Sequence, residues 1–569
     1  MGKIDRHGLA VGAAWGLLTA GLLVFVVKFG RNIPAWEEWF DLPVLFGDDD
    51  RGGWVVGRLQ EHRYVLGRAV LLTAFELSGR DFRAGMVLSV AALSAAALVL
   101  VRTAARVRGR PHAADALLPA VLLNPGGAEN LILGYQVAFT LAVLLAALMI
   151  RLAATADDAP PARTGAAAGL LIGLLALSGW VGLAFVPVGV GWVALLAWRV
   201  YRSGGGRGRA LALLVLPATA AGYFVWSYLD IRRNPLPGAT TNPPAAAARV
   251  WCEFVSTAFG PIGQEGWPGS GGVAVGLLAV VVGGLAAQAA TPPRRASAVG
   301  WLAVIGAVGL MGYGVASRRT SGFAPRNFHL TALLVAVAYL TVVRSVPARR
   351  WVSRLAAAAA VAFGGLVVSA GWVAGVRTAA QQQIWNDFYT QDRLAGLPLE
   401  YLASRRQLFP YPGFRDAVRS LRAYGHPAGA GIPDGPPVEV VPLPLPPPGY
   451  DPVPGDPLQA SVLGRPAVWR FDLGGEQTVI GLRVRFRYGR DSVQVPVHVL
   501  WPDRSGQAPG TAVAGCFPWL IPGVWELDFW VNARTSVLWL RPLYAAEPIE
   551  LLDVHLLRPL APNPPGPLR

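Results

Sequence analysis

The sequence predicts a polytopic α-helical membrane protein of about eleven spans, followed by a C-terminal all-β sandwich. Three observations predict this fold class. The 569 residues are 53% hydrophobic and only 15% charged, apolar runs recur through residue 376, and the hydrophobic period changes to two after residue 465. Soluble proteins are about a quarter charged, so the composition points to a chain whose solvent is largely lipid and excludes disordered, collagen-like and disulfide-scaffold classes.

The helical part rests on apolar stretches suited to crossing about 30 Å of hydrocarbon. The predicted spans are residues 8–30, 84–101, 113–124, 132–150, 165–178, 181–198, 210–229, 272–290, 297–316, 329–343 and 355–376. The stretches 113–124 and 165–178 are shorter than a usual span, so the count depends on them. The first stretch exceeds the apolar core of a signal peptide and lacks a clear small-residue cleavage site, so we expect it to remain as a span.

Basic residues predict the orientation of the spans. One set of span ends carries at least two basic residues at every member, as at 102–110 and 344–354, whereas the opposite loops 124–131 and 179–180 hold none. The positive-inside rule then predicts a cytoplasmic N-terminus, and an odd span count predicts an extracytoplasmic C-terminal domain. The net charge of +16 is interpreted as this bias. No basic stripe with interleaved aromatic residues appears, so no nucleic-acid partner is expected.

Three segments follow the predicted membrane domain 1–376. Residues 377–431 predict a polar, partly helical juxtamembrane segment, residues 432–457 a Pro-rich linker, and residues 458–569 the β-sandwich. Apolar residues in that last segment alternate with arginines, which we interpret as a solvated face: Ile480, Leu482, Val484 and Phe486 against Arg483, Arg485 and Arg487. Cys252 and Cys516 lack metal-ligand spacing, and both a disulfide and two free thiols remain open for them.

The predicted first outer loop, 31–83, carries several ionisable residues suited to chemistry. Glu37, Glu38 and Asp41 lie within five residues and beside tryptophans. Such carboxylates can act as a general base or hold a divalent metal, and the alternative is a solvated turn with an aromatic belt. Later in the loop, Glu61 and Arg63 flank His62, which can carry a proton or hydrogen-bond a substrate.

Two further outer segments carry candidate binding residues. Glu129 and Gln136 lie near the predicted bilayer boundary, where polar groups are expensive and tend to be functional; helix–helix hydrogen bonding is the alternative. Arg326 comes just before a span that starts on the outer side, and Arg319 lies in the same loop. A guanidinium at a helix N-terminus suits phosphate, and the alternative is snorkelling toward lipid head groups.

Together these motifs resemble those of bacterial membrane glycosyltransferases of the GT-C fold, including relatives of the protein O-mannosyltransferases. The motifs are Glu37-Glu38, Glu61-His62-Arg63, Glu129 with Gln136, and Arg326, and the resemblance covers roughly residues 8–430. It implies an enzyme of the bacterial plasma membrane that moves a sugar from a polyprenyl-phosphate-linked donor to a glycan, lipid or protein acceptor on the extracytoplasmic face. Many members have aspartate in the acidic motif, whereas this chain has Glu-Glu, so which glutamate acts is open.

The resemblance also implies a role for each candidate residue. The catalytic candidates are Glu37, Glu38, Asp41 and His62; the donor-phosphate candidates are Arg326 and Arg319; and the substrate-binding candidates are Glu61, Arg63, Glu129 and Gln136. A divalent metal stays open, and no other cofactor is indicated.

Two other classes of function remain as alternatives. A lipid or glycan transporter or flippase would place ionisable groups near the middle of the membrane, with repeats and broken helices. A non-catalytic membrane scaffold would display the sandwich as a carbohydrate-binding module. The sugar, the acceptor, the role of the sandwich and the oligomeric state are not predicted by the sequence.

Overall fold

The computed structural model describes residues 6–35, 37–46, 50–58, 63–233, 241–345, 350–394, 414–430, 438–445, 469–488, 497–502, 510–514, 523–542 and 550–559. The chain divides into two compact units. The first, here the helical unit, comprises Met1–Asn32, Asp50–Pro235 and Thr240–Gln383, and the second, here the mixed unit, comprises Ile33–Asp49, Leu236–Ala239 and Ile384–Arg569.

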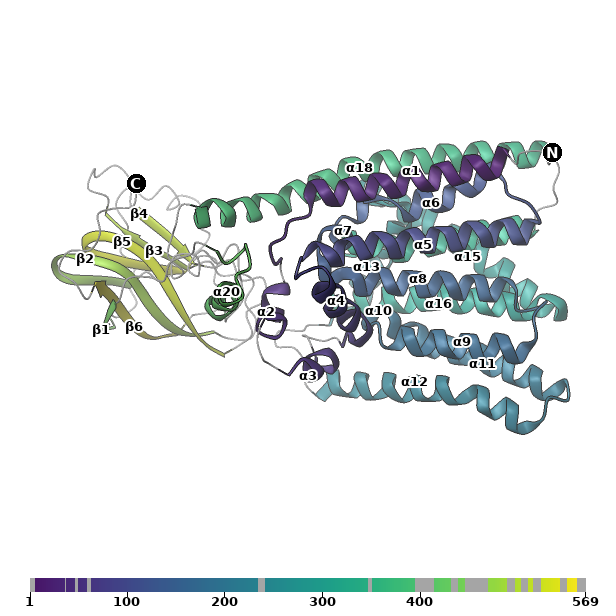
Figure 1. The fold of residues 1–569 in the computed structure, drawn as a ribbon, viewed down its shortest axis with the longest axis horizontal. Helices are drawn as coiled ribbons and strands as arrows, with labels where there is room; N and C mark the ends of the chain where they lie inside the picture. Colours follow the sequence, from purple (N-terminus) through teal and green to yellow (C-terminus); the bar gives the residue numbers. More distant parts are fainter. Residues whose placement is uncertain are drawn as a thin grey trace. The chain divides into compact units, whose positions relative to one another are not determined.

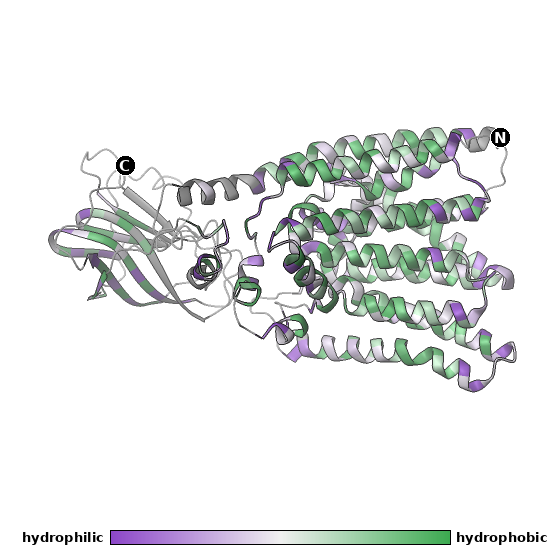
Figure 2. Ribbon diagram, in the orientation of Figure 1, coloured by the Kyte–Doolittle hydropathy of each residue, from purple (hydrophilic) through white to green (hydrophobic). Residues whose placement is uncertain are grey.

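Nine helices among the described residues are long and apolar enough to cross a membrane, which makes the chain a multi-pass helical membrane protein. They are α1 (Arg6–Phe29), α5 (Arg83–Arg108), α8 (Val137–Ala154), α11 (Phe185–Arg202), α12 (Arg207–Arg233), α15 (Gly269–Ala290), α16 (Arg295–Arg318), α17 (Phe328–Ser345) and α18 (Arg350–Leu394) (Figure 1). Hydrophobic residues dominate these helices along their length, and hydrophilic residues gather mostly toward their ends (Figure 2).

Shorter helices fill the connections. They are α2 (Glu38–Phe46), α3 (Arg51–Val56), α4 (Val65–Leu77), α6 (Leu117–Leu122), α7 (Glu129–Ile132), α9 (Pro161–Ala176), α10 (Trp180–Leu183), α13 (Pro244–Ser256), α14 (Pro261–Glu265) and α20 (Phe414–Ala423), with the 3-10 turns η1 (Ala113–Ala116), η2 (Pro125–Gly127), η3 (Gly134–Gln136), η4 (Thr257–Phe259), η5 (Pro292–Arg294) and η6 (Pro325–Asn327).

The predicted span 113–124 is wrong as a membrane-length helix. The region folds as η1 and the six-residue α6, which packs against α1, α5 and α17. The fully buried Asp115 is bound by Arg108 at 2.8 Å, which fixes the start of the region. Asn124 precedes Pro125 and is extended, with φ −104° and ψ 118°, because a residue before proline avoids the helical region. The other short prediction, 165–178, forms the 16-residue helix α9.

The helical unit has two ends, which we call basal and apical. At the basal end, α1 begins next to the region before η1, where the His7 and His112 rings stack 5.7 Å apart. Arg108 at the end of α5 donates to the Tyr339 hydroxyl, so α17 ends at the basal end too. Asp157 pairs with Arg344 near that end of α17 and accepts the backbone N–H of Ala296 at the start of α16, so it also lies at the basal end. The apical end is the opposite one, where α5 and α17 begin.

Residues 112–134, here the broken crossing, return the chain from the basal to the apical end. The segment starts at His112, beside the start of α1, and ends at Gly134, which packs so closely on Gly85 of α5 that a side chain at Gly85 would collide with it. Between these points run only η1, α6, η2 and α7. Irregular backbone at membrane depth is tolerated where protein buries it. Nearly every residue from Leu117 to Gly134 is buried.

The described strands of the mixed unit form one six-stranded antiparallel sheet in the order β1-β6-β2-β5-β3-β4. Their bounds are β1 (Val438–Leu443), β2 (Trp469–Tyr488), β3 (Val497–Trp501), β4 (Gly510–Ala514), β5 (Gly523–Pro542) and β6 (Glu550–Pro559). The ladder between β2 and β5 shifts register between Asp472 and Gln477 and again between Val479 and Gly481. Side chains from both sides of these shifts share one apolar core. The β domain is therefore confirmed, and the arrangement as two facing sheets stays a prediction.

Two predicted boundaries differ from the structure. Strand β1 lies inside the predicted linker 432–457 and pairs with β6, with Val438 opposite Pro559. Pro442 fits in this strand because β1 is at the edge among the described strands, where one side needs no ladder hydrogen bonds. The last span also does not end at residue 376, since α18 runs without a break from Arg350 to Leu394.

Candidate anion site at the apical end

The loop between α16 and α17, residues 319–327, is anchored by two buried or half-buried polar side chains in its first half. Glu253 of α13 is 5% exposed, and its Oε2 accepts the Gly322 N–H at 3.0 Å and the Ser321 hydroxyl at 3.1 Å. Asn242 donates its Nδ2 to the carbonyls of Ala316 at 2.8 Å and Arg319 at 2.7 Å. The loop backbone is therefore held by groups outside the loop.

The second half of the loop is anchored to the broken crossing. Asn130 donates its Nδ2 to the carbonyl of Arg326 at 2.8 Å. Within the loop, Asn327 donates to the carbonyl of Gly322 at 3.2 Å. Arg326 thus projects from a backbone fixed on both sides.

The structure brings Arg326 and Glu129 together. The Arg326 Nε lies 4.0 Å from Glu129 Oε2, and the two side chains are 35% and 29% exposed. Among the described residues, the Arg326 guanidinium makes no hydrogen bond or ion pair besides this one, whose 4.0 Å distance is too long for a hydrogen bond. A guanidinium carries five N–H donors in a fork that matches a carboxylate or phosphate. This guanidinium therefore has donors available for an anionic ligand.

The other predicted residues of the helical unit make contacts of their own. Arg63 pairs with Asp230 near the end of α12 at 2.9 Å, and its guanidinium lies over the Trp226 ring, 4.3 Å from the centroid. Gln136 is 2% exposed, and its Oε1 has no partner among the described residues. Arg319 is half-buried, and its own backbone carbonyl accepts the hydrogen bond from Asn242.

The acidic motif belongs to the mixed unit, in and just before α2. Glu38 is the first residue of α2 and 2% exposed, with its Oε2 accepting the Ala35 N–H at 2.8 Å. Asp41 is 3% exposed. Glu37 is half-buried, and its Oε2 lacks a partner in the described part of the chain. The alternative of a solvated turn is therefore wrong for Glu38 and Asp41. Helix α2 packs against α20, and the Phe46 ring lies 5.3 Å from that of His426.

Several predictions fall outside the described residues. Glu61 and His62 are not among the described residues. Cys516 is not described either, so its pairing with Cys252 stays a prediction. Cys252 itself is half-buried in α13 and is the one cysteine that the structure describes. The described residues contain no group of three or more His, Cys, Asp or Glu side chains placed to hold a metal ion.

Sequence reasoning missed the buried polar cluster that supports the site. Asn130 and His329 are each 1% exposed, and Asn124 is 2% exposed. Their sequence signal is weak, because no local pattern relates the three residues, which lie in segments about 200 positions apart. The Asn124-Pro125 pair, which ends α6 and starts η2, is the one local feature that could have indicated a break in the span.

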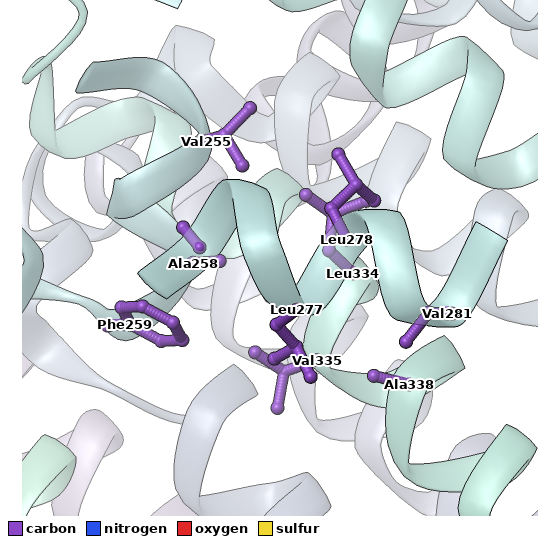
Figure 3. Close-up of a pocket in the computed structure, with 10 residues that line it drawn as sticks. Val255, Ala258, Phe259, Leu277, Leu278, Val281, Leu334, Val335 and Ala338 are labelled. Carbon is purple, nitrogen blue, oxygen red and sulfur yellow. The ribbon is translucent and has the colours of Figure 1, made fainter. Parts of the chain in front are cut away.

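A small apolar pocket lies between α13, η4, α15 and α17 (Figure 3). Its lining is Val255, Ala258, Phe259, Ala274, Leu277, Leu278, Val281, Leu334, Val335 and Ala338. Leu334 and Ala338 follow Arg326 along η6 and α17 by 8 and 12 positions, which corresponds to roughly 12–18 Å along the helix axis. The pocket thus lies deeper in the bundle than the Arg326 guanidinium.

No protein-family model matches the chain, and no curated protein matches it.

Proposed function

We propose that the protein is an integral membrane glycosyltransferase of the GT-C type, which moves a sugar from a polyprenyl-phosphate-linked donor to an acceptor on the extracytoplasmic face. The observation that carries the proposal is the Arg326 guanidinium. It is anchored through its backbone, lies beside Glu129 at 4.0 Å, and has donors left for an anion.

The proposed chemistry is a displacement at the anomeric carbon of the sugar. A carboxylate takes the proton of the acceptor hydroxyl, the acceptor oxygen forms the new glycosidic bond, and the bond to the phosphate oxygen breaks. The polyprenyl phosphate leaves with the electron pair. Arg326 stabilises the charge that develops on this phosphate, with Arg319 as a second cation. Glu37 or Glu38 is the proposed base, and Asp41 and His62 remain catalytic candidates beside them.

The apolar pocket supports a lipid-linked donor rather than a soluble nucleotide sugar. All ten lining residues are apolar, and Leu334 lies about 12 Å along the helix axis from Arg326. The hydrocarbon chain of a phosphate bound at Arg326 is proposed to run along α17 toward this pocket. The Thr257–Thr331 hydrogen bond of 3.0 Å joins η4 to α17 on the apical side of the pocket-lining residues of α17.

Mass spectrometry of lipids that copurify with the full-length protein tests the donor class. Wild type should carry a polyprenyl-phosphate sugar, and Arg326→Ala should lose it. Arg294→Ala is the matched control, because Arg294 is an exposed arginine in η5 at the basal end, and it should keep the lipid. Absence of the lipid from wild type, or equal amounts in Arg326→Ala, would contradict the proposal.

Glutamine substitutions test the acidic motif. Glutamine keeps the length of glutamate and an oxygen that can accept the Ala35 N–H, so Glu38→Gln should fold while losing basicity. The double variant Glu37→Gln/Glu38→Gln should abolish transfer with expression intact, and the two single variants identify the acting residue. Normal turnover of the double variant would exclude both glutamates as the base.

A translocator of lipid-linked glycans is the second candidate, and the broken crossing favours it. Transporters often build their sites from discontinuous helices, and Asn124 and Asn130 are buried polar residues in such a segment. Proteoliposomes loaded with a fluorescent polyprenyl-phosphate sugar separate the two candidates. The transferase forms a glycosylated product, whereas a translocator moves the lipid between leaflets without changing it.

A further inference from the structure

Asn130 connects the two residues of the anion site through the backbone. It directly follows Glu129 in the chain, and its Nδ2 donates to the carbonyl of Arg326 at 2.8 Å. Asn130 and Arg326 are 196 positions apart. This one amide therefore sets the distance between the broken crossing and the loop that carries the guanidinium.

His329 in turn fixes the orientation of the Asn130 amide. Asn130 Nδ2 lies 2.9 Å from His329 Nδ1, and His329 Nε2 lies 3.1 Å from the carbonyl of Asn124. A carbonyl only accepts, so Nε2 carries the hydrogen. The Asn130 Nδ2 also faces the Arg326 carbonyl and is therefore the donor to Nδ1. The ring is a neutral Nε2–H tautomer whose two nitrogens each have a partner.

The surroundings leave the cluster little room to rearrange. A side chain at Gly127 would collide with the His329 ring, and one at Gly371 of α18 would collide with the Asn124 side chain. Asn124 also donates to the carbonyl of Val367 at 3.2 Å. The Asn130 Oδ1 has no partner among the described residues. A flipped amide would turn that oxygen toward two other acceptors, the Arg326 carbonyl and His329 Nδ1, so the network favours the observed orientation.

We propose that Asn130, oriented by His329, is the positioning residue of the anion site, which holds the Arg326 guanidinium beside Glu129 in the arrangement that receives the ligand. Only the nature of the ligand, a lipid phosphate, rests on the proposed function. The arrangement of Arg326 itself is independent of it, so each part can fail separately.

The test compares Asn130→Ala and the isosteric Asn130→Asp with Asn242→Ala in the full-length protein. Asn242 is a matched control because it also donates to two backbone carbonyls, that of Ala316 in α16 and that of Arg319 at the start of the same loop, but not to that of Arg326. Phenylglyoxal modifies arginine side chains, and peptide mass spectrometry gives the rate at each site. We expect the Asn130 variants to raise the modification rate at Arg326 about threefold, with Arg294 unchanged as the internal reference and Asn242→Ala close to wild type.

Binding of dodecyl phosphate, measured by calorimetry on the same proteins, gives the second readout. The Asn130 variants should bind about tenfold more weakly, equivalent to about 1.4 kcal/mol, while Asn242→Ala stays within about twofold of wild type. If Asn130→Ala does not fold, Asn130→Asp carries the test, since it has the same size but no amide donor.

The outcomes separate the two proposals. An unchanged modification rate at Arg326 in the Asn130 variants, or an equal rise in Asn242→Ala, would overturn the positioning role. Wild type that fails to bind dodecyl phosphate, together with the expected change in Arg326 modification, would count against the lipid-phosphate function and leave the positioning role standing. Loss of phosphate binding in Arg326→Ala but not in the Asn130 variants would count against the positioning role and leave the lipid-phosphate function standing.

Discussion

Arg108 at the basal end and Arg326 at the apical end are both arginines beside apolar helices, yet their surroundings differ. Arg108 donates to both oxygens of the fully buried Asp115, at 2.8 and 2.9 Å, and to the Tyr339 hydroxyl at 2.7 Å. Arg326 has only the 4.0 Å ion pair with Glu129 among the described residues and is twice as exposed, 35% against 17%.

This difference separates an arginine that stabilises the fold from one that can bind a ligand. The hydrogen bonds of Arg108 compensate for the desolvation of Asp115, and losing them would leave a buried charge unpaired. Arg326 is partly solvated, so it needs no partner to be tolerated, and its free donors are available to an anion. The following predictions test whether the two roles are as distinct as the contacts indicate.

The largest expected effect is on the stability of the basal end. Arg108→Ala should destabilise the protein by about 3–5 kcal/mol, because the buried Asp115 carboxylate would lose its cationic partner. Unfolding of the purified protein in detergent measures the loss. The apolar double variant Arg108→Met/Asp115→Leu should recover most of it, and a single variant as stable as wild type would show that the pair is dispensable.

The next effect should be on activity rather than stability. Arg326→Ala should slow sugar transfer about 100-fold, which is typical of losing one oxyanion-stabilising group, while its stability stays within about 0.5 kcal/mol of wild type. Arg326→Lys should keep part of the activity, since a lysine supplies charge but no planar fork. A drop in stability comparable to that of Arg108→Ala would erase the distinction between the two ends.

Asp157 is a second carboxylate at the basal end that we expect to support stability rather than activity. It accepts the N–H groups of Ala296 at 3.0 Å and Ser297 at 3.3 Å at the start of α16, and pairs with Arg344 at 3.3 Å. Asp157→Ala should cost about 1–2 kcal/mol of stability with little effect on transfer. Asp157→Asn should cost less because its oxygen still caps the helix, and thermal melting of both variants checks the order.

The smallest effect concerns paired arginines of the sheet, which lie on the surface. Arg485 lies opposite Asp553 on β6, with Nη1 3.0 Å from Oδ2, and the side chains are 46% and 33% exposed. Arg485→Ala should cost about 0.2–1 kcal/mol. A double-mutant cycle with Asp553→Ala measures the pair, and the coupling should shrink at high salt because surface charges are screened.

Local sequence patterns predicted most of the long helices and the β domain. Apolar length is enough to place α1 or α16, since a span needs only its own composition. The run 113–124 has the same composition, but the buried Asp115–Arg108 pair and the Asn124-Pro125 break divert it. Those features act through contacts with other segments, which hydropathy does not record.

The candidate site was predictable to a similar extent. Glu129 and Arg326 were identified separately, as a polar residue near the bilayer boundary and a cation at a helix start, and the structure adds their proximity. Asn130 and His329 were missed because their function depends on each other across 199 positions. The strand at 438–443 was hidden for a similar reason, since its pairing partner β6 lies more than 100 residues away.

The broken crossing also has a consequence for how the protein enters the membrane. Its longest helix, α6, has six residues, too few to leave a translocation channel for lipid as an independent segment. The Asn130 partner His329 is synthesised 199 residues later, and the Asn124 partner Val367 is synthesised 243 residues later. We therefore expect residues 112–134 to stay in a sheltered, water-accessible or protein-lined environment during biogenesis and to settle into the bundle only when α17 and α18 arrive.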